Sequence, residues 1–197
     1  MCSTICDHIE YHNLLSCHQW GFRKNHSTED LLLHQCETWH KALDEGKCIA
    51  VLFIDYQKAF DSVAHSIVLL KLAALGISGN LLEIIRDYLT DRKQFTIVNG
   101  SNSSKANIDY GVPQGSILGP ISFSANVNDL PQKSGNQNGE TNLFADDSIA
   151  FEIGSTVDDA ISKISETTSN VEAYSLTNSL TMHPEKCKLM LLSLIHI

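Results

Sequence analysis

Two adjacent aspartates, Asp146 and Asp147, stand between two short apolar runs, and this arrangement constrains the fold more than any other feature of the chain. The runs, 142–145 and 148–151, have the composition of β-strands, so the aspartates are predicted at the turn of a hairpin. Adjacent carboxylates repel one another and resist burial, and an apolar hairpin has no structural use for them. A divalent cation removes the repulsion because hard cations bind carboxylate oxygens. A polar hairpin tip that binds no metal is the alternative interpretation.

A third carboxylate occurs in similar surroundings, because the apolar run 51–54 leads directly into Asp55. If the two strands lie side by side, Asp55, Asp146 and Asp147 meet at one edge of a sheet. Such a set is what two-metal phosphoryl transfer needs, with ions ~4 Å apart that hold the attacking and leaving oxygens. The third carboxylate therefore favours a metal centre over a plain polar turn.

The composition is that of a globular protein. The chain has 197 residues, of which 43% are hydrophobic and 19% charged, enough to bury a core. No apolar run approaches the ~18 residues of a membrane span, and the N-terminus lacks the pattern of a signal peptide, so we expect an intracellular protein with no membrane partner. The net charge of −9 argues against a free-standing nucleic-acid binder, which is usually basic. Neither the compartment, nucleus or cytoplasm, nor the oligomeric state follows from the sequence.

Hydrophobic periodicity predicts helices and strands in mixed order, with helix starts marked by Ser or Thr and helix ends by Gly. In the helix that ends near residue 179, five apolar residues are predicted to face inward: Val157, Ile161, Ile164, Val171 and Leu176. The predicted helices are one from Ser27 to Gly46, one ending at Gly76, one over 81–89, one over 117–129, and one that Ser155 or Thr156 caps and that runs to 179. The predicted strands are 48–54, a hairpin of 95–98 with 106–110, the two runs around the paired aspartates, and two short strands within 180–192.

Two loops have compositions that suit contact with phosphate. The segment 19–28 has a glycine among aromatic residues, followed by Arg23 and Lys24, although an ordinary solvated basic turn has the same composition. The segment 111–120 is rich in glycine and proline and contains Gln114. Its backbone amides either face an anion or form a tight structural turn.

Four segments, taken in order along the chain, resemble the reverse transcriptase domain of non-LTR retrotransposons of the jockey-like or a related LINE type. The segment 111–120 is the most specific of them, and the resemblance extends from about residue 10 to about residue 192. It implies an α+β fold, the palm of a right-hand polymerase, in which helices back an antiparallel sheet. Residues of about 1–47 would form part of the fingers and residues of about 48–192 the palm with inserted finger elements, with the thumb absent. The four segments are 19–28, 53–61, 111–120 and 144–147.

The resemblance also implies an activity, that of an RNA-directed DNA polymerase. Such an enzyme joins dNTPs to the 3′-hydroxyl of a DNA primer on an RNA template and uses two Mg²⁺ ions, with Mn²⁺ as the other candidate. Asp55 and Asp146 would bridge the ions and Asp147 would support them. A catalytically inactive, truncated remnant of a retrotransposon reverse transcriptase is the alternative, against which the intact aspartates argue.

Further residues acquire roles from the same resemblance. Phe60 is placed like the residue that stacks under the deoxyribose and excludes a 2′-hydroxyl, whereas an aromatic residue without that context is usually part of a core. Lys186 matches a lysine that protonates pyrophosphate, and a solvated turn lysine is its other interpretation. Two residues depart from the family pattern, since Ser124 and Asn126 stand where apolar residues are usual. The nucleotide-binding residues that the resemblance implies are Arg23, Tyr56, Phe60, Gln114 and Gly115.

Overall fold

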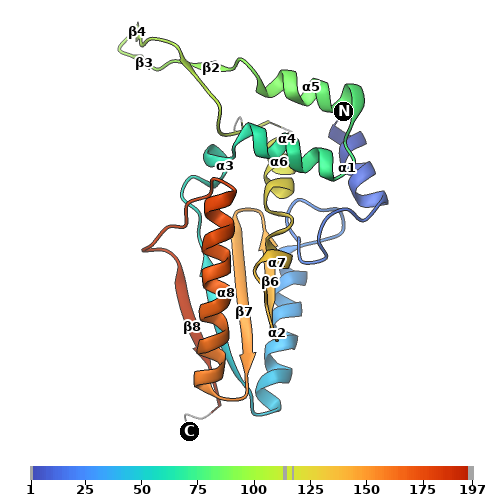
Figure 1. The fold of residues 1–197 in the computed structure, drawn as a ribbon, viewed down its shortest axis with the longest axis vertical. Coiled ribbons are helices and arrows are strands. Elements are labelled where there is room, and N and C mark those ends of the chain that lie inside the picture. The colour runs from blue at the N-terminus through green and yellow to red at the C-terminus, as the bar shows by residue number, and fades with distance from the viewer. Residues whose placement is uncertain (1, 113–114, 117, 195–197) are drawn as a thin grey trace.

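The computed structural model describes residues 2–112, 115–116 and 118–194 (Figure 1). Its centre is a four-stranded antiparallel sheet in the order β6-β7-β1-β8. Helices pack on this sheet, so the predicted α+β architecture, an antiparallel sheet backed by helices, is confirmed. The strands are β1 (Cys48–Ile54), β6 (Glu140–Phe144), β7 (Asp147–Gly154) and β8 (Lys188–Leu192).

Strand β1 is central because it is apolar throughout and has a partner on each side. Six of its seven residues are buried, and only Phe53 is exposed. Val51 lies opposite Phe151 of β7 and opposite Met190 of β8. A strand buried on both faces has a nearly continuous hydrophobic sequence, which is why this strand is predicted with its observed bounds.

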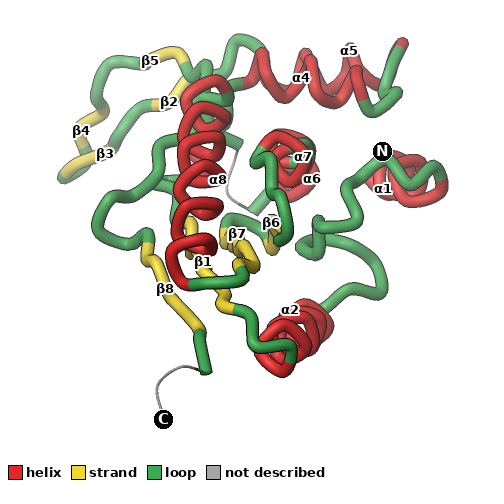
Figure 2. Tube along the Cα trace, turned by 60° about the horizontal axis from the view of Figure 1, so that its bottom comes forward, coloured by secondary structure: helices red, strands yellow, loops and turns green. Residues whose placement is uncertain are grey.

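Two helices cover the two faces of the sheet (Figure 2). Helix α8 (Val157–Thr177) buries Ile164 and Val171, which belong to the main core. Helix α2 (Thr28–Asp44) packs on the other face, where the Trp39 ring meets the Phe151 ring edge-on at 5.8 Å. Both helices start where expected, because Ser27 and Thr156 accept hydrogen bonds from backbone N–H groups of their first turns.

The inward prediction for two residues of α8 is wrong. Ile161 is 41% exposed and Leu176 is 80% exposed. The buried face of the helix includes Ala160, Ile164 and Val171, and one residue further along a helix points about 100° away. Ile161 follows Ala160 directly and therefore falls outside the face that contacts the sheet.

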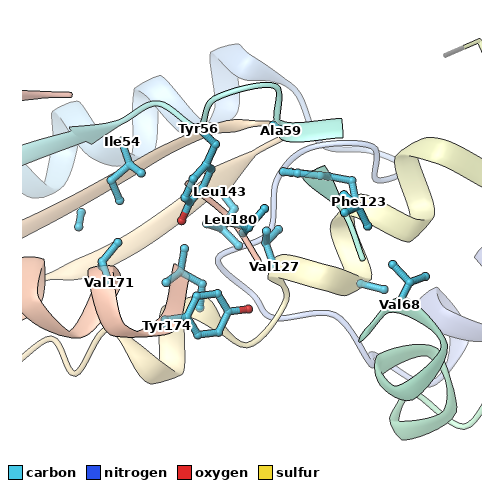
Figure 3. Packing of buried hydrophobic residues seen from close by; sticks show 14 of the residues in the cluster. Ile54, Tyr56, Ala59, Val68, Phe123, Val127, Leu143, Val171, Tyr174 and Leu180 are labelled. Carbon is cyan, nitrogen blue, oxygen red and sulfur yellow. The ribbon is translucent and has the colours of Figure 1, made fainter. Parts of the chain in front are cut away.

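Of the remaining helices, α7 (Leu130–Lys133) packs against β6 and α8, and the others gather at one end of the sheet, beyond the C-terminal end of β1 (Figure 1). Figure 3 shows that the core is continuous between the two parts, since Phe123 and Val127 of α6 extend the cluster that Tyr56 and Leu143 share with the sheet. Among the described residues, no helix has the length and hydrophobicity that a membrane span requires. These helices are α1 (Cys2–Tyr11), α3 (Ala59–Ser62), α4 (His65–Ala74), α5 (Gly79–Leu89), α6 (Leu118–Val127) and α7 (Leu130–Lys133).

The predicted hairpin after α5 exists, but its pairing differs from the prediction. Strand β3 (Ile97–Val98) pairs with β4 (Ser101–Asn102) rather than with residues 106–110. The turn residues Asn99 and Gly100 both have positive φ angles, 50° and 79°, which is typical of a tight two-residue hairpin turn. Below this tip, β2 (Lys93–Gln94) pairs with β5 (Ala106–Asn107).

Two short strands are predicted within residues 180–192, and the structure has one of them. Strand β8 forms, while Met182 makes only an isolated bridge with Tyr56. Between them the backbone turns, and the N–H groups of Lys186 and Cys187 both donate to the carbonyl of His183. The other predicted strand is thus limited to this bridge, which is flanked by hydrogen bonds from the Gln57 N–H to the Thr181 carbonyl and from the His183 N–H to the Asp55 carbonyl.

Candidate active site

The register of the sheet brings the three predicted carboxylates to one edge. Ile54, the last residue of β1, lies opposite Ser148 of β7. Asp55 follows Ile54, and Asp147 precedes Ser148, so both stand at the same end of two neighbouring strands. Asp146 occupies the turn that joins β6 to β7. Antiparallel pairing of the two apolar runs is therefore enough to place Asp55 beside the paired aspartates.

A segment far away in the sequence supports the turn that carries Asp146. Residues 18–20 run beside β6, with the Trp20 N–H donating to the Leu143 carbonyl at 2.8 Å. Gly21 follows, and a Cβ atom at this position would lie 2.2 Å from the backbone nitrogen of Ala145 in the turn. Only glycine permits this approach. The glycine that the sequence suggests for phosphate contact thus packs against the turn between the strands.

The backbone of Asp55 is held by the turn that precedes β8. Its carbonyl accepts a hydrogen bond from the His183 N–H at 2.8 Å, and its N–H donates to the Cys187 Sγ at 3.4 Å. The Nζ of Lys186, in the same turn, lies 3.5 Å from the Asp55 Oδ2. Sequence reasoning missed His183 and Cys187, because no local pattern links them to a residue more than one hundred positions away.

The three carboxylates influence one another electrostatically. Burial raises the pKa of Asp147 above its ordinary value, and the negative charges of Asp146 and Asp55 raise it further. The Asp55 Oδ2 is buried and has no hydrogen-bond donor among the described residues. Asp55, Asp147 and Lys186 line a common cavity of about 400 Å³. This edge therefore concentrates negative charge, and among the described residues Asp55 forms an ion pair with Lys186, whose side chain is 64% exposed.

The chemistry of this edge suits a divalent cation. Its donors are hard carboxylate oxygens, one of them buried without a hydrogen-bond partner among the described residues, and their mutual repulsion is what a cation relieves. The three carboxylates lie at the same sheet edge, but they do not converge on a common coordination centre. In the described part of the chain, no group of three or more His, Cys, Asp or Glu side chains is arranged to hold an ion.

Phe60, in the segment that follows Asp55, lies in an aromatic cluster. Its ring stacks on Phe123 with a centroid distance of 4.8 Å and meets Phe22 edge-on at 6.4 Å. Phe60 is half-buried and packs against the main core. The stack on Phe123 agrees with the core interpretation of Phe60, and the sugar contact stays a prediction.

Two predicted nucleotide contacts, those of Tyr56 and Arg23, find no support in the structure. Tyr56 is 5% exposed, its hydroxyl accepts a hydrogen bond from the Ser175 Oγ at 3.3 Å, and burial raises its pKa to about 12. The Arg23 guanidinium binds both carboxylate oxygens of Glu10 and donates to the Ser16 carbonyl. Both side chains are thus engaged inside the fold.

The glycine-rich loop is described only in part. Gly115 is exposed and has a φ angle of 77°, a left-handed conformation that favours glycine. Gln114 lies outside the described residues. For this loop the nucleotide-binding role stays a prediction.

Comparison of the amino-acid sequence with known proteins identifies relatives of this chain. Residues 2–194 match the family model described as reverse transcriptase (RNA-dependent DNA polymerase). The chain is 30% identical over 178 residues to the RNA-directed DNA polymerase from mobile element jockey of Drosophila funebris, covering 86% of this chain and 19% of that protein. It is 33% identical over 129 residues to the probable RNA-directed DNA polymerase from transposon BS of Drosophila melanogaster, covering 66% of this chain and 14% of that protein. The chain thus spans less than a fifth of the length of these relatives.

Solved structures show the same fold at low sequence identity. Telomerase from Candida tropicalis in complex with the TWJ fragment of telomeric RNA superposes with a TM-score of 0.72 at 12% identity, covering 96% of this chain and 33% of that one. Telomerase from Candida albicans in complex with the same type of fragment gives a TM-score of 0.63 at 15% identity, covering 100% of this chain and 33% of that one. These likenesses establish the fold of the chain as that of a right-hand polymerase.

Proposed function

The chain belongs to the reverse transcriptase family, and on that premise we propose that it is the core of an RNA-directed DNA polymerase that adds dNTPs to the 3′-hydroxyl of a DNA primer on an RNA template. One observation carries the proposal. The register of β1 against β7 sets Asp55 and Asp147 side by side at the sheet edge that also carries Asp146. Family membership makes the protein an enzyme by descent, and intact carboxylates at this edge are the feature that nucleotidyl transfer requires.

In this proposal the three aspartates hold two divalent ions, Mg²⁺ or Mn²⁺. When bound, such ions lower the pKa of the attacking hydroxyl and neutralise the charge of the triphosphate. Asp55 is suited to be the fixed ligand, because His183 and Cys187 form hydrogen bonds with its backbone. Its buried Oδ2 accepts no hydrogen bond from the described residues and is therefore available to a metal ion.

The neighbouring side chains supply the other parts of the reaction. Lys186 is exposed and close to Asp55, so its ammonium group can give a proton to the departing pyrophosphate. Phe60 is half-buried, and on family resemblance we assign its ring to the sugar of the incoming nucleotide, where a 2′-hydroxyl would lose its water without gaining a hydrogen bond. Gly115 and Gln114 are assigned to the nucleotide and template on family resemblance.

Primer extension by a chimera tests the function. The matched residues of this chain replace their counterparts in the jockey polymerase of Drosophila funebris, which supplies the rest of the enzyme. We expect Mg²⁺-dependent extension of a DNA primer on an RNA template. Asp55→Asn should lower the rate by at least about 100-fold, because removing one group that stabilises transition-state charge has effects of this order. The matched control is Asp44→Asn, an exposed aspartate that precedes the opposite end of β1.

Two results would count against the proposal. Undiminished extension by the Asp55→Asn chimera would remove the metal-binding role from this sheet edge. A folded chimera that does not extend the primer, measured beside an active parental jockey enzyme, would favour the inactive remnant instead.

A further inference from the structure

The hairpin over residues 92–108, here called the basic arm, takes no part in the site described above. Figures 1 and 2 both show its strands projecting away from the sheet and helices. Every residue from 93 to 107 is exposed. Its strands β2 to β5 form only two-residue ladders with one another. The arm therefore orders a long stretch of backbone without burying side chains of its own.

The arm is basic in an acidic protein. It contains Arg92, Lys93 and Lys105 and no Asp or Glu, whereas the whole chain has a net charge of −9. The nearest acids in sequence are Asp91 and Asp109, which flank its base. Across the described ranges, none of the three cations forms a salt bridge; Arg92 instead lies over the Tyr88 ring at 5.2 Å. The positive charge is left for an external anion.

The arm also exposes apolar side chains near its tip. Ile97 is 63% exposed, Val98 62% and Phe95 46%. An isolated two-stranded hairpin is marginally stable in water, and clustered exposed apolar residues usually mark a contact surface. Cations and apolar side chains on one projecting ribbon suit a ligand that offers both phosphates and sugar faces.

A cavity at the base of the arm is lined in part by the segment that follows Asp55 in the sequence. It has a volume of about 570 Å³ and is lined by Arg92 and Gln94 of the arm, by Tyr110, and by Lys58 from the segment that follows Asp55. Asp61 lines it as well. Two cations, an amide and a phenol give it several hydrogen-bond donors.

We propose that the basic arm and the cavity at its base bind the RNA–DNA hybrid duplex formed by template and primer, an inference that rests on the proposed polymerase function. Duplexes that contain RNA favour a wide, shallow minor groove bordered by phosphates, which a two-stranded ribbon can cross. Ile97 and Val98 then contact sugars in the groove, and the arm cations contact phosphates on its rims. Single-stranded RNA is less suitable, because stacking platforms present successive aromatic rings and Phe95 is the sole aromatic residue of the arm.

Fluorescence anisotropy with a hybrid of about 16 base pairs, over a series of KCl concentrations, tests this proposal. The variant Arg92→Gln/Lys93→Gln/Lys105→Gln should bind at least about tenfold more weakly. Its slope of log K against log [KCl] should fall by about one for each phosphate that the variant no longer neutralises. The control variant Lys41→Gln/Lys47→Gln/Lys133→Gln removes the same charge elsewhere and should bind as the unaltered chain does. Ile97→Ser/Val98→Ser should weaken binding and leave the slope unchanged.

Several results would overturn the proposal. These are absence of hybrid binding by the unaltered chain, equal affinity and slope for the arm variant and the control variant, or a larger loss for single-stranded RNA than for the hybrid. Sedimentation that shows a dimer of the chain dissociated by the arm substitutions would assign the arm to a second copy instead. All measurements are made in EDTA, so failure of the metal-dependent reaction at Asp55 leaves this test unaffected, and the reverse holds as well.

Discussion

Strand β1 and the basic arm are both short β-structures rich in β-branched residues, and they differ in what stabilises them. In β1, Val51 is fully buried and has strand partners on both sides. In the arm, Ile97 and Val98 are more than half exposed and pair only across their own turn. Burial of a valine or isoleucine side chain contributes about 1.5–3 kcal/mol, which β1 gains and the arm does not. Residue type alone therefore does not distinguish a structural strand from a binding strand.

The difference agrees with the two roles we assign. A metal site needs carboxylates fixed by rigid neighbours, and Asp55 follows the most completely buried strand of the sheet. A surface that follows nucleic acid along its length can instead gain order from its ligand. Because residues 93–107 of the arm are all exposed, the arm can adapt to a bound duplex without disrupting the core.

The largest expected contrast between the two regions is in stability. Phe151 is fully buried against Trp39, so Phe151→Ala should lower the free energy of unfolding by about 3–5 kcal/mol. Phe95→Ala, the same substitution in the arm, should change it by less than about 0.5 kcal/mol. Urea denaturation of the two variants measures both values. A loss of several kcal/mol for Phe95→Ala would show that the arm packs against the body in solution and would break the comparison.

A smaller change in the free energy of unfolding is expected for a substitution at a buried polar residue of the core. Asn126 is fully buried in α6, and neither its side-chain nitrogen nor its side-chain oxygen has a hydrogen-bond partner among the described residues. Leucine has a similar volume and no polar atoms to satisfy. Asn126→Leu should therefore raise the free energy of unfolding by about 1–3 kcal/mol, measured by the same denaturation experiment. A destabilised Asn126→Leu variant would contradict the expectation that the unpaired amide lowers stability.

Much of the sheet could be predicted from the sequence, because each strand is indicated by residues that are adjacent in the chain. The apolar run of β1 and the runs around Asp146 specify strands, and capping residues such as Ser27 specify helix starts. The juxtaposition of Asp55 with the paired aspartates could be predicted too, once both runs were taken as neighbouring strands. The likeness of the chain to reverse transcriptases points to the same pair of strands.

Contacts between distant parts of the chain could not be predicted in this way. Nothing near Arg23 shows that Glu10 will bind its guanidinium, and nothing near Tyr56 shows that Ser175 will cover its hydroxyl. A cation in a loop, and an aromatic residue beside an aspartate that is a candidate metal ligand, have sequence contexts that a nucleotide contact and a structural role share. The two pairing errors, in the hairpin after α5 and before β8, arose where short apolar runs carry no burial pattern.

Binding of Mn²⁺ to the chain, followed by electron paramagnetic resonance, tests the central claim most directly. The claim is that the sheet edge of Asp55, Asp146 and Asp147 is a two-metal centre. It predicts that the chain removes two ions from solution, that Asp55→Asn and Asp146→Asn each abolish this binding, and that Asp44→Asn leaves it unchanged. Binding that persists in Asp55→Asn, or an unaltered chain that takes up no Mn²⁺, would contradict the claim.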